Sequence, residues 1–127
     1  MSRVLLDTSV LIGAHDPGDL EGAISAASLA ELHFGTLVAS DPDERARRTQ
    51  RLAVIEATFD PFPIYAPVAR EWGRLAAAVA ERGGRARRRA IDLAIAATAN
   101  VHGVPLLTAD TADLAIIGDL IKVQALS

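Results

Sequence analysis

The chain contains 127 residues, of which 50% are hydrophobic and 23% charged, and its formal net charge is -3. This length and composition exclude a disordered chain and predict one globular domain over residues 1–127. There is no cysteine, which excludes disulfides, thiolate nucleophiles and thiolate zinc sites and is consistent with the reducing cytoplasm. The apolar run before Asp7 is too short for a secretory signal or a membrane span, so we expect a cytoplasmic protein without membrane attachment.

Hydrophobic periodicity predicts strands that alternate with helices. Ser28 and Glu31 have the spacing of a capping box, and Asp41 followed by Pro42 is typical of a helix start. In chain order, we expect strands at 4–6, 23–27, 62–65, 106–107 and 121–124, helices at 28–38, 42–58, 68–79 and 91–101, and a loop with a short helix at 110–117.

Two of these segments carry information about the fold. The helix at 91–101 is apolar on nearly every side, which indicates a helix packed between layers, and its one charge is Asp92. The strand at 62–65 lies among prolines, which confine it to an edge or to a short length. The alternation of strands and helices predicts an α/β fold in which a mainly parallel sheet is covered by helices on both faces.

Four acidic residues fall at one edge of this predicted sheet. Asp7 ends the first strand, and Glu31 lies in the first turn of the helix after the second strand. Asp92 opens the buried helix, and Asp110 follows the strand at 106–107. In an open parallel sheet, ligands bind outside the carboxyl ends of the strands, where the following helices also begin.

Each acid also has a simpler explanation, because a carboxylate near a helix N-terminus gains about 0.3 to 1 kcal/mol from the helix dipole. This explanation is strongest for Glu31, which the capping box alone would account for, and weaker for Asp92, whose charge on an apolar helix has a desolvation cost. Taken together, however, like charges about 4 Å apart repel by about 4 kcal/mol per pair. Four acids on one edge therefore predict a bound cation.

The ligand chemistry indicates which cation. Ligands that are all oxygen suit Mg²⁺ or Mn²⁺, and the three histidines lack the spacing of a zinc site: His15, His33 and His102. Such an ion lowers the pKa of a bound water and neutralises charge on a phosphodiester, which is phosphoryl-transfer chemistry. Thr8 and Thr108 lie beside the acids and are predicted to hydrogen-bond a ligand carboxylate or water, whereas Ser9 is more simply interpreted as a helix cap.

Nine of the 13 basic residues lie in two short stretches, one near residues 45–51 and one at 82–89. The second run stands before a helix N-terminus, where positive charge is unfavourable to the dipole, so either the adjacent Asp92 or a bound polyanion should offset it. We therefore expect weak RNA phosphate contacts from Arg85, Arg87, Arg88 and Arg89. The first run is interpreted as a solvated helix face, formed by Arg45, Arg47, Arg48 and Arg51.

Four motifs occur in order across nearly the whole chain: V-L-L-D-T-S-V-L-I around Asp7, S-L-A-E-L around Glu31, D-L-A-I-A-A-T-A from Asp92, and G-V-P-L-L-T-A-D-T-A-D-L with Asp110 and Asp113. Together they resemble the PIN domain ribonucleases, in particular the VapC toxins of bacterial and archaeal toxin-antitoxin pairs. The resemblance implies a three-layer α/β/α sandwich. It also implies that the first acid of each motif belongs to a cluster that binds Mg²⁺ or Mn²⁺ and cleaves RNA.

The resemblance further implies a homodimer and a VapB-like antitoxin that blocks the site. Asp113 matches an acid that often precedes phenylalanine in the family, but Leu114 follows here, so Asp113 is expected as an outer ligand. A PIN-like module that holds RNA or protein without cutting is the main alternative. Because all four motif positions are acidic, we expect an enzyme.

Other classes fit less well. A haloacid dehalogenase-like phosphatase needs a second aspartate where Ser9 stands, and a receiver domain needs a lysine near the last strand, whereas Lys122 lies within it. No glycine-rich loop follows a strand, which argues against dinucleotide and triphosphate binders.

Overall fold

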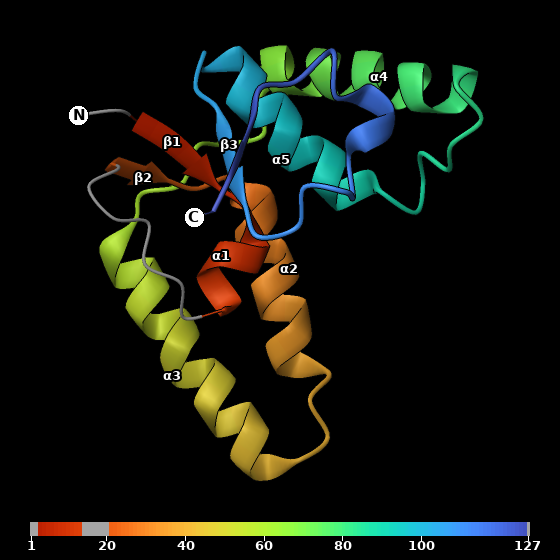
Figure 1. Cartoon of the computed structure of the whole chain (residues 1–127). Helices are drawn as coiled ribbons and strands as arrows, with labels where there is room; N and C mark the ends of the chain where they lie inside the picture. The colour runs from red at the N-terminus through yellow and green to blue at the C-terminus, as the bar shows by residue number, and fades with distance from the viewer. Residues whose placement is uncertain (1–2, 14–20, 127) are drawn as a thin grey trace.

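The computed structural model describes residues 3–13 and 21–126 (Figure 1). Its sheet has four strands in the order β2-β1-β3-β4, and every neighbouring pair is parallel. The strands are β1 (Arg3–Leu6), β2 (Glu21–Ala23), β3 (Leu106–Thr108) and β4 (Val123–Ala125). This arrangement confirms the predicted parallel sheet and brings β1 and β3, from opposite ends of the chain, side by side.

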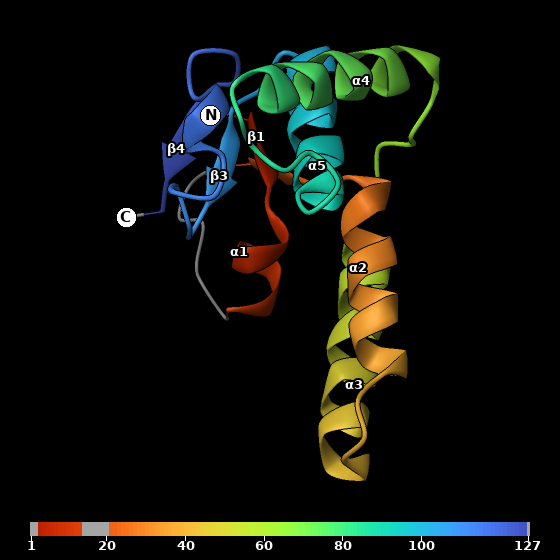
Figure 2. The same ribbon diagram turned by 90° about the vertical axis from the view of Figure 1, so that its right-hand side faces the viewer.

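Helices cover both faces of this sheet (Figures 1 and 2). They are α1 (Thr8–Ile12), α2 (Ala26–Leu37), α3 (Pro42–Thr58), α4 (Ala66–Glu81), α5 (Ala90–Val101) and the short 3₁₀ helix η1 (Ala115–Ile117). None of these helices is long and apolar enough to cross a membrane.

Strand residues alternate between two cores, because successive side chains of a strand point to opposite faces. Leu5 and Leu106 pack with buried residues of α4 and α5. Val4, Leu6 and Leu107 pack with residues of α1, α2 and α3. Two cores separated by one sheet make the predicted three-layer α/β/α sandwich.

Helix α5 lies against the sheet as predicted, and every residue from 93 to 99 is buried. Its alanines allow close packing against α2 and α4, while Leu93 and Ile95 fill the core. Asp92 lies immediately before this buried run, in the first turn of α5. The packing of α5 therefore fixes the position of that carboxylate.

Helices α2 and α3 form an arm that extends away from the sheet (Figure 2). The predicted start of α3 is confirmed, since the side chain of Asp41 accepts a hydrogen bond from the backbone N–H of Asp43 and Pro42 is the first helical residue. Leu52 and Ile55 are buried near the sheet end of the arm. These anchors fix which face of α3 looks toward the sheet.

The predicted start of the second helix is wrong. Helix α2 begins at Ala26, and its N-cap is Ser25, whose hydroxyl accepts a hydrogen bond from the N–H of Ala27 at 3.1 Å. Ser28 is buried inside the helix and receives a hydrogen bond from the hydroxyl of Thr8 at 3.2 Å. No cap is predicted at Ser25 from the sequence, and burial of Ser28 against Thr8 removes the predicted cap from the helix terminus.

Three predicted strands also need correction. The second strand is residues 21–23 rather than 23–27, because the cap at Ser25 already turns the chain into α2. The predicted strand at 62–65 is reduced to a single bridge between Phe62 and Ser25. Prolines at 61 and 63 lack the N–H groups that a ladder needs. The last strand is residues 123–125 rather than 121–124.

Candidate active site

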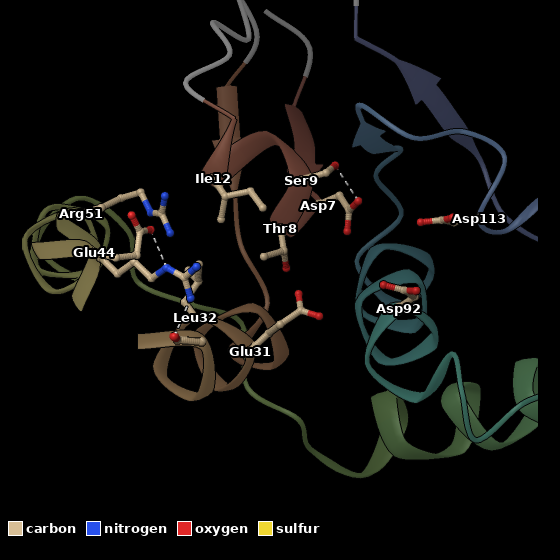
Figure 3. A pocket seen from close by; sticks show the side chains of 12 residues that line it. Asp7, Thr8, Ser9, Ile12, Glu31, Leu32, Glu44, Arg51, Asp92 and Asp113 are labelled. Carbon is tan, nitrogen blue, oxygen red and sulfur yellow. Dashed lines mark hydrogen bonds and ion pairs between the residues drawn. The ribbon is translucent and has the colours of Figure 1, made fainter. Parts of the chain in front are cut away.

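Five carboxylates line one cleft of about 410 Å³ at the carboxyl edge of the sheet, a volume within the range of ligand sites. One of them, Glu44 of α3, is paired with Arg47 and Arg48. The other four come from separate elements. Asp7 lies between β1 and α1, Glu31 in α2, Asp92 in α5, and Asp113 in the turn before η1. Figure 3 shows these side chains arranged around a common space. The acids of three motifs thus come together as predicted, with Asp113 as the fourth.

Asp110 does not line this cleft. It is exposed and borders a smaller adjoining pocket, which Asp7, Asp92 and Asp113 also line. The structure therefore places Asp110 beside the cluster, and Asp113 in the position that we expected Asp110 to take.

The side chain of Asp7 does not cap helix α1, although its backbone stands at the N-cap position. Its Oδ2 instead accepts hydrogen bonds from the hydroxyl of Ser9 at 2.8 Å and from the hydroxyl of Thr108 at 2.8 Å. The interpretation of Ser9 as only a cap is therefore wrong, whereas the expected contact of Thr108 with an acid is confirmed. Capping does not explain this carboxylate.

Backbone amides orient these two hydroxyls. The N–H of Ala109 donates to Ser9 Oγ at 3.2 Å, and the N–H of Asp110 donates to Thr108 Oγ1 at 3.1 Å. Because each hydroxyl oxygen accepts an amide hydrogen, its own hydrogen is free to point toward Asp7. The loop after β3 is thereby tied to the acid that follows β1.

Thr8 has a different role from the one predicted. Its hydroxyl donates to Ser28 of α2. Within the described residues, it makes no hydrogen bond to an acidic side chain. It is buried and lines the cleft between Asp7 and Glu31. Thr8 thus joins α1 to α2 rather than orienting a carboxylate.

A capping box does not explain Glu31 either. With Ser25 as the N-cap, Glu31 is the sixth residue of α2 and lies in its second turn, beyond the first-turn amides that a capping box joins. Its side chain points into the cleft instead (Figure 3). A partly buried carboxylate directed at other carboxylates needs a different partner.

The pKa of Asp92 depends on the other acids of the cleft. Burial raises the pKa of Asp92, and the negative charges of Asp7, Glu31 and Asp113 raise it further. The guanidinium of Arg89 opposes these effects; its Nη1 is 3.7 Å from Asp92 Oδ2 and 3.2 Å from Asp113 Oδ1. Within the second arginine run, Arg89 thus contacts the predicted partner Asp92, and it contacts Asp113 as well.

The donor set suits a hard divalent cation. The cleft offers carboxylate and hydroxyl oxygens and no imidazole or thiolate, which is the ligand chemistry of Mg²⁺ and Mn²⁺. Within residues 3–13 and 21–126, no three acidic or histidine side chains yet stand close enough to enclose an ion. Hydroxyls hold Asp7, and Arg89 holds Asp92 and Asp113, so these side chains would have to move for an ion to bind them together.

The arginines that line the cleft are not the ones that we expected. Arg48 and Arg51 of α3, interpreted as part of a solvated face, line the same cleft as the acids. Arg85, Arg88 and Arg89 border a neighbouring groove together with Asp113, and Arg87 is exposed. No sequence pattern distinguishes Arg48 and Arg51 from a solvated face, because the direction of their helix face depends on how the α2–α3 arm packs.

Comparison with known proteins places this site in a family. The model of the PIN domain matches residues 4–119. Ribonuclease VapC4 of Mycobacterium tuberculosis is 36% identical over 125 residues, covering 93% of both chains. Ribonuclease VapC5 of the same species is 38% identical over 115 residues, covering 84% of this chain and 82% of that protein. The chain belongs to the PIN domain family, and its resemblance to VapC proteins is confirmed.

Solved structures agree with this assignment. The crystal structure of VapBC-5, a toxin-antitoxin system of M. tuberculosis, matches with a TM-score of 0.83 and 34% identity over 99% of this chain and 98% of that chain. VapBC2 of Rickettsia felis, solved with a DNA fragment, matches with a TM-score of 0.77 but 17% identity over 98% and 99% of the two chains. At that identity the second likeness concerns the fold alone.

Proposed function

We propose that this protein is a metal-dependent endoribonuclease of the VapC type, which hydrolyses phosphodiester bonds of RNA. The names of the similar mycobacterial proteins support the ribonuclease activity. The observation that carries the metal dependence is the half-buried carboxylate of Asp92, whose pKa is raised by burial and by three acids from distant parts of the chain. A fold has little reason to gather these charges unless a cation joins them.

In this proposal Asp7, Glu31 and Asp92 hold Mg²⁺ or Mn²⁺, with Asp113 and Asp110 at the border of the site. A bound ion of this kind activates water and neutralises negative charge on the phosphodiester. Ser9 and Thr108 hold the carboxylate of Asp7 in one orientation through their hydroxyl hydrogens.

The partner proteins follow from the relatives as well. Because the similar structure VapBC-5 belongs to a toxin-antitoxin system, we propose that a VapB-like antitoxin binds this chain and blocks the cleft. The homodimer implied by the resemblance and the cytoplasm as the place of action belong to the same proposal. Light scattering of the purified chain, alone and with the product of the neighbouring gene, tests both assemblies.

Cleavage assays test the enzyme against the binding module. The purified protein is incubated with structured RNAs in Mg²⁺, in Mn²⁺ and in chelator, beside the variants Asp92→Asn and Asp60→Asn. Asp60 is exposed and outside the cleft, so its variant is a matched control for loss of one charge. We expect metal-dependent cleavage that Asp92→Asn abolishes and Asp60→Asn retains. RNA binding without cleavage in either metal would establish the binding module instead.

A further inference from the structure

The cleft has two walls of opposite net charge. Four acids come from the β1–α1 junction, α2, α5 and the turn before η1, whereas α3 contributes Arg48, Arg51 and the acid Glu44. Glu44 is neutralised by its ion pairs with Arg47 and Arg48. Figure 3 shows Arg51 across the cleft from the four acids. Ile12 and Leu32 lie between the two groups along the cleft. The acids of the negative wall would hold the metal ion, but Arg48 and Arg51 of the positive wall have no role in that chemistry.

Arg48 is held by its own protein. Its Nε donates to Glu44 Oε1 at 2.8 Å, and its Nη1 donates to the carbonyl oxygen of Gly35 at 2.7 Å. Glu44 also accepts from Arg47 at 2.6 Å, and these two arginines hold the pKa of Glu44 below its usual range. Arg48 therefore fastens α3 to α2, and much of its donor capacity is already used.

Arg51 differs from Arg48 in this respect. It follows three positions later on the same face of α3, is partly buried and lines the cleft. Among the described residues it makes no hydrogen bond or ion pair. The neighbouring Leu52 is buried in the core, which fixes the rotation of α3 about its axis and keeps Arg51 directed at the cleft. A guanidinium in this position offers five donors to a ligand.

We propose that Arg51 binds a backbone phosphate of the RNA next to the one that reacts, and that Arg48 positions it by fixing α3 against α2. The identity of the ligand rests on the proposed function. An RNA strand carries a phosphate at every nucleotide, so one phosphate can lie at the acidic wall with its cation while a neighbour reaches the arginine wall. The planar guanidinium matches two phosphate oxygens at once, which a lysine does not.

Binding in the absence of metal separates this proposal from catalysis. A fluorescein-labelled single-stranded RNA of mixed sequence is titrated with the full chain in EDTA, and anisotropy is followed over a range of KCl concentrations. The variants are Arg51→Gln, Arg51→Lys and Arg70→Gln; Arg70 is exposed on α4 and outside the cleft, so its variant is the matched control. Thermal melting confirms that each variant is folded.

We expect Arg51→Gln to bind RNA about tenfold more weakly than the parent, whatever the RNA sequence. The slope of log affinity against log salt should fall by about 0.7, the value for one phosphate contact on a single strand. Arg51→Lys should keep that slope but bind with intermediate affinity, and Arg70→Gln should match the parent. In Mg²⁺, Arg51→Gln should raise KM for RNA cleavage more than it lowers kcat.

The outcomes distinguish the two proposals. If Arg51→Gln binds RNA as the parent does while the parent still cleaves in Mg²⁺, the role of Arg51 is overturned and the ribonuclease stands. If Arg51→Gln weakens binding but no metal supports cleavage, Arg51 is a phosphate contact of a binding module. If the parent binds no RNA in EDTA, the phosphate contact of Arg51 is overturned.

Discussion

Thr108 donates a hydrogen bond of 2.8 Å to Asp7, although the two residues are 101 positions apart in the chain. The parallel pairing of β1 with β3 makes this contact possible, because it places the ends of both strands at one edge of the sheet. The N–H of Asp110 donates to the hydroxyl oxygen of Thr108, so the hydroxyl hydrogen of Thr108 can point to the carboxylate of Asp7. The side chain of Asp7 is therefore held in one orientation by β3 and the loop that follows it, without any ligand.

Replacing Thr108 with valine should reduce RNA cleavage and metal affinity by about 10- to 100-fold, the usual effect of removing a group that orients a metal ligand. Valine keeps the volume and the β-branch but cannot donate to Asp7. Cleavage rates and a Mg²⁺ titration measure the two effects. Thr58→Val is the control, since Thr58 is exposed and bonds only within α3. Wild-type metal affinity in Thr108→Val would contradict the proposed orientation of Asp7.

The variant Asp92→Asn should be more stable than the parent at neutral pH and no more stable at acid pH. The pKa of Asp92 is raised in the folded protein, so the folded state keeps this proton to higher pH than the unfolded state does. Its ionisation therefore removes stability as the pH rises from the unfolded pKa through the folded pKa. Denaturant unfolding from about pH 3 to 8 in chelator measures this difference, taking ~3.9 as the unfolded pKa of aspartate. Asp60→Asn should show no such gain, and an equal gain in both variants would disprove the effect of the acidic cluster.

Arg89→Gln should raise the pKa of Asp92 further. Arg89 is the cation that opposes the raised pKa, and it lies between Asp92 and Asp113. Carboxyl carbon chemical shifts followed by NMR through a pH titration in chelator report the change directly. Arg70→Gln removes the same charge from an exposed site on α4 and should leave the pKa of Asp92 where it is. An unchanged or lowered pKa of Asp92 in Arg89→Gln would show that the guanidinium of Arg89 does not oppose the raised pKa of this carboxyl.

Mg²⁺ should raise the melting temperature of the parent, since a ligand that binds only the folded state stabilises it. At a metal concentration 100 times the dissociation constant, the gain is about 2.7 kcal/mol. The gain should be smaller in Asp92→Asn and unchanged in Asp60→Asn. Differential scanning calorimetry with and without millimolar metal measures it. Equal stabilisation of all three proteins would indicate that metal binds outside the cleft.

The sequence was sufficient to predict the features that depend on strand ends and on strong periodicity. Because β1 and α5 are almost wholly apolar, their single acids Asp7 and Asp92 could be located at the ends of buried elements. The rule that parallel strands share a carboxyl edge then placed both acids together. The same reasoning could not separate Asp110 from Asp113, because both lie in irregular segments whose path depends on tertiary packing.

Features that depend on helix phase were harder to predict. Ser9 and Thr8 are neighbours, and only the rotation of α1 decides that the first contacts Asp7 while the second contacts Ser28. Likewise, the direction of Arg51 follows from the packing of α3 through Leu52, which no local pattern reveals. A polar face that lines a cleft has the same composition as one that faces water.

The strand order has a consequence for biosynthesis. Asp7 is translated 101 residues before Thr108, the β3 residue that donates a hydrogen bond to it, and Asp113 follows later still. Domains form as units once enough of the polypeptide has emerged. A nascent chain that stops short of β3 lacks one of the two neighbours of β1 and the Asp113 side of the cleft, so any nuclease activity must wait until β3 and the turn before η1 have been translated.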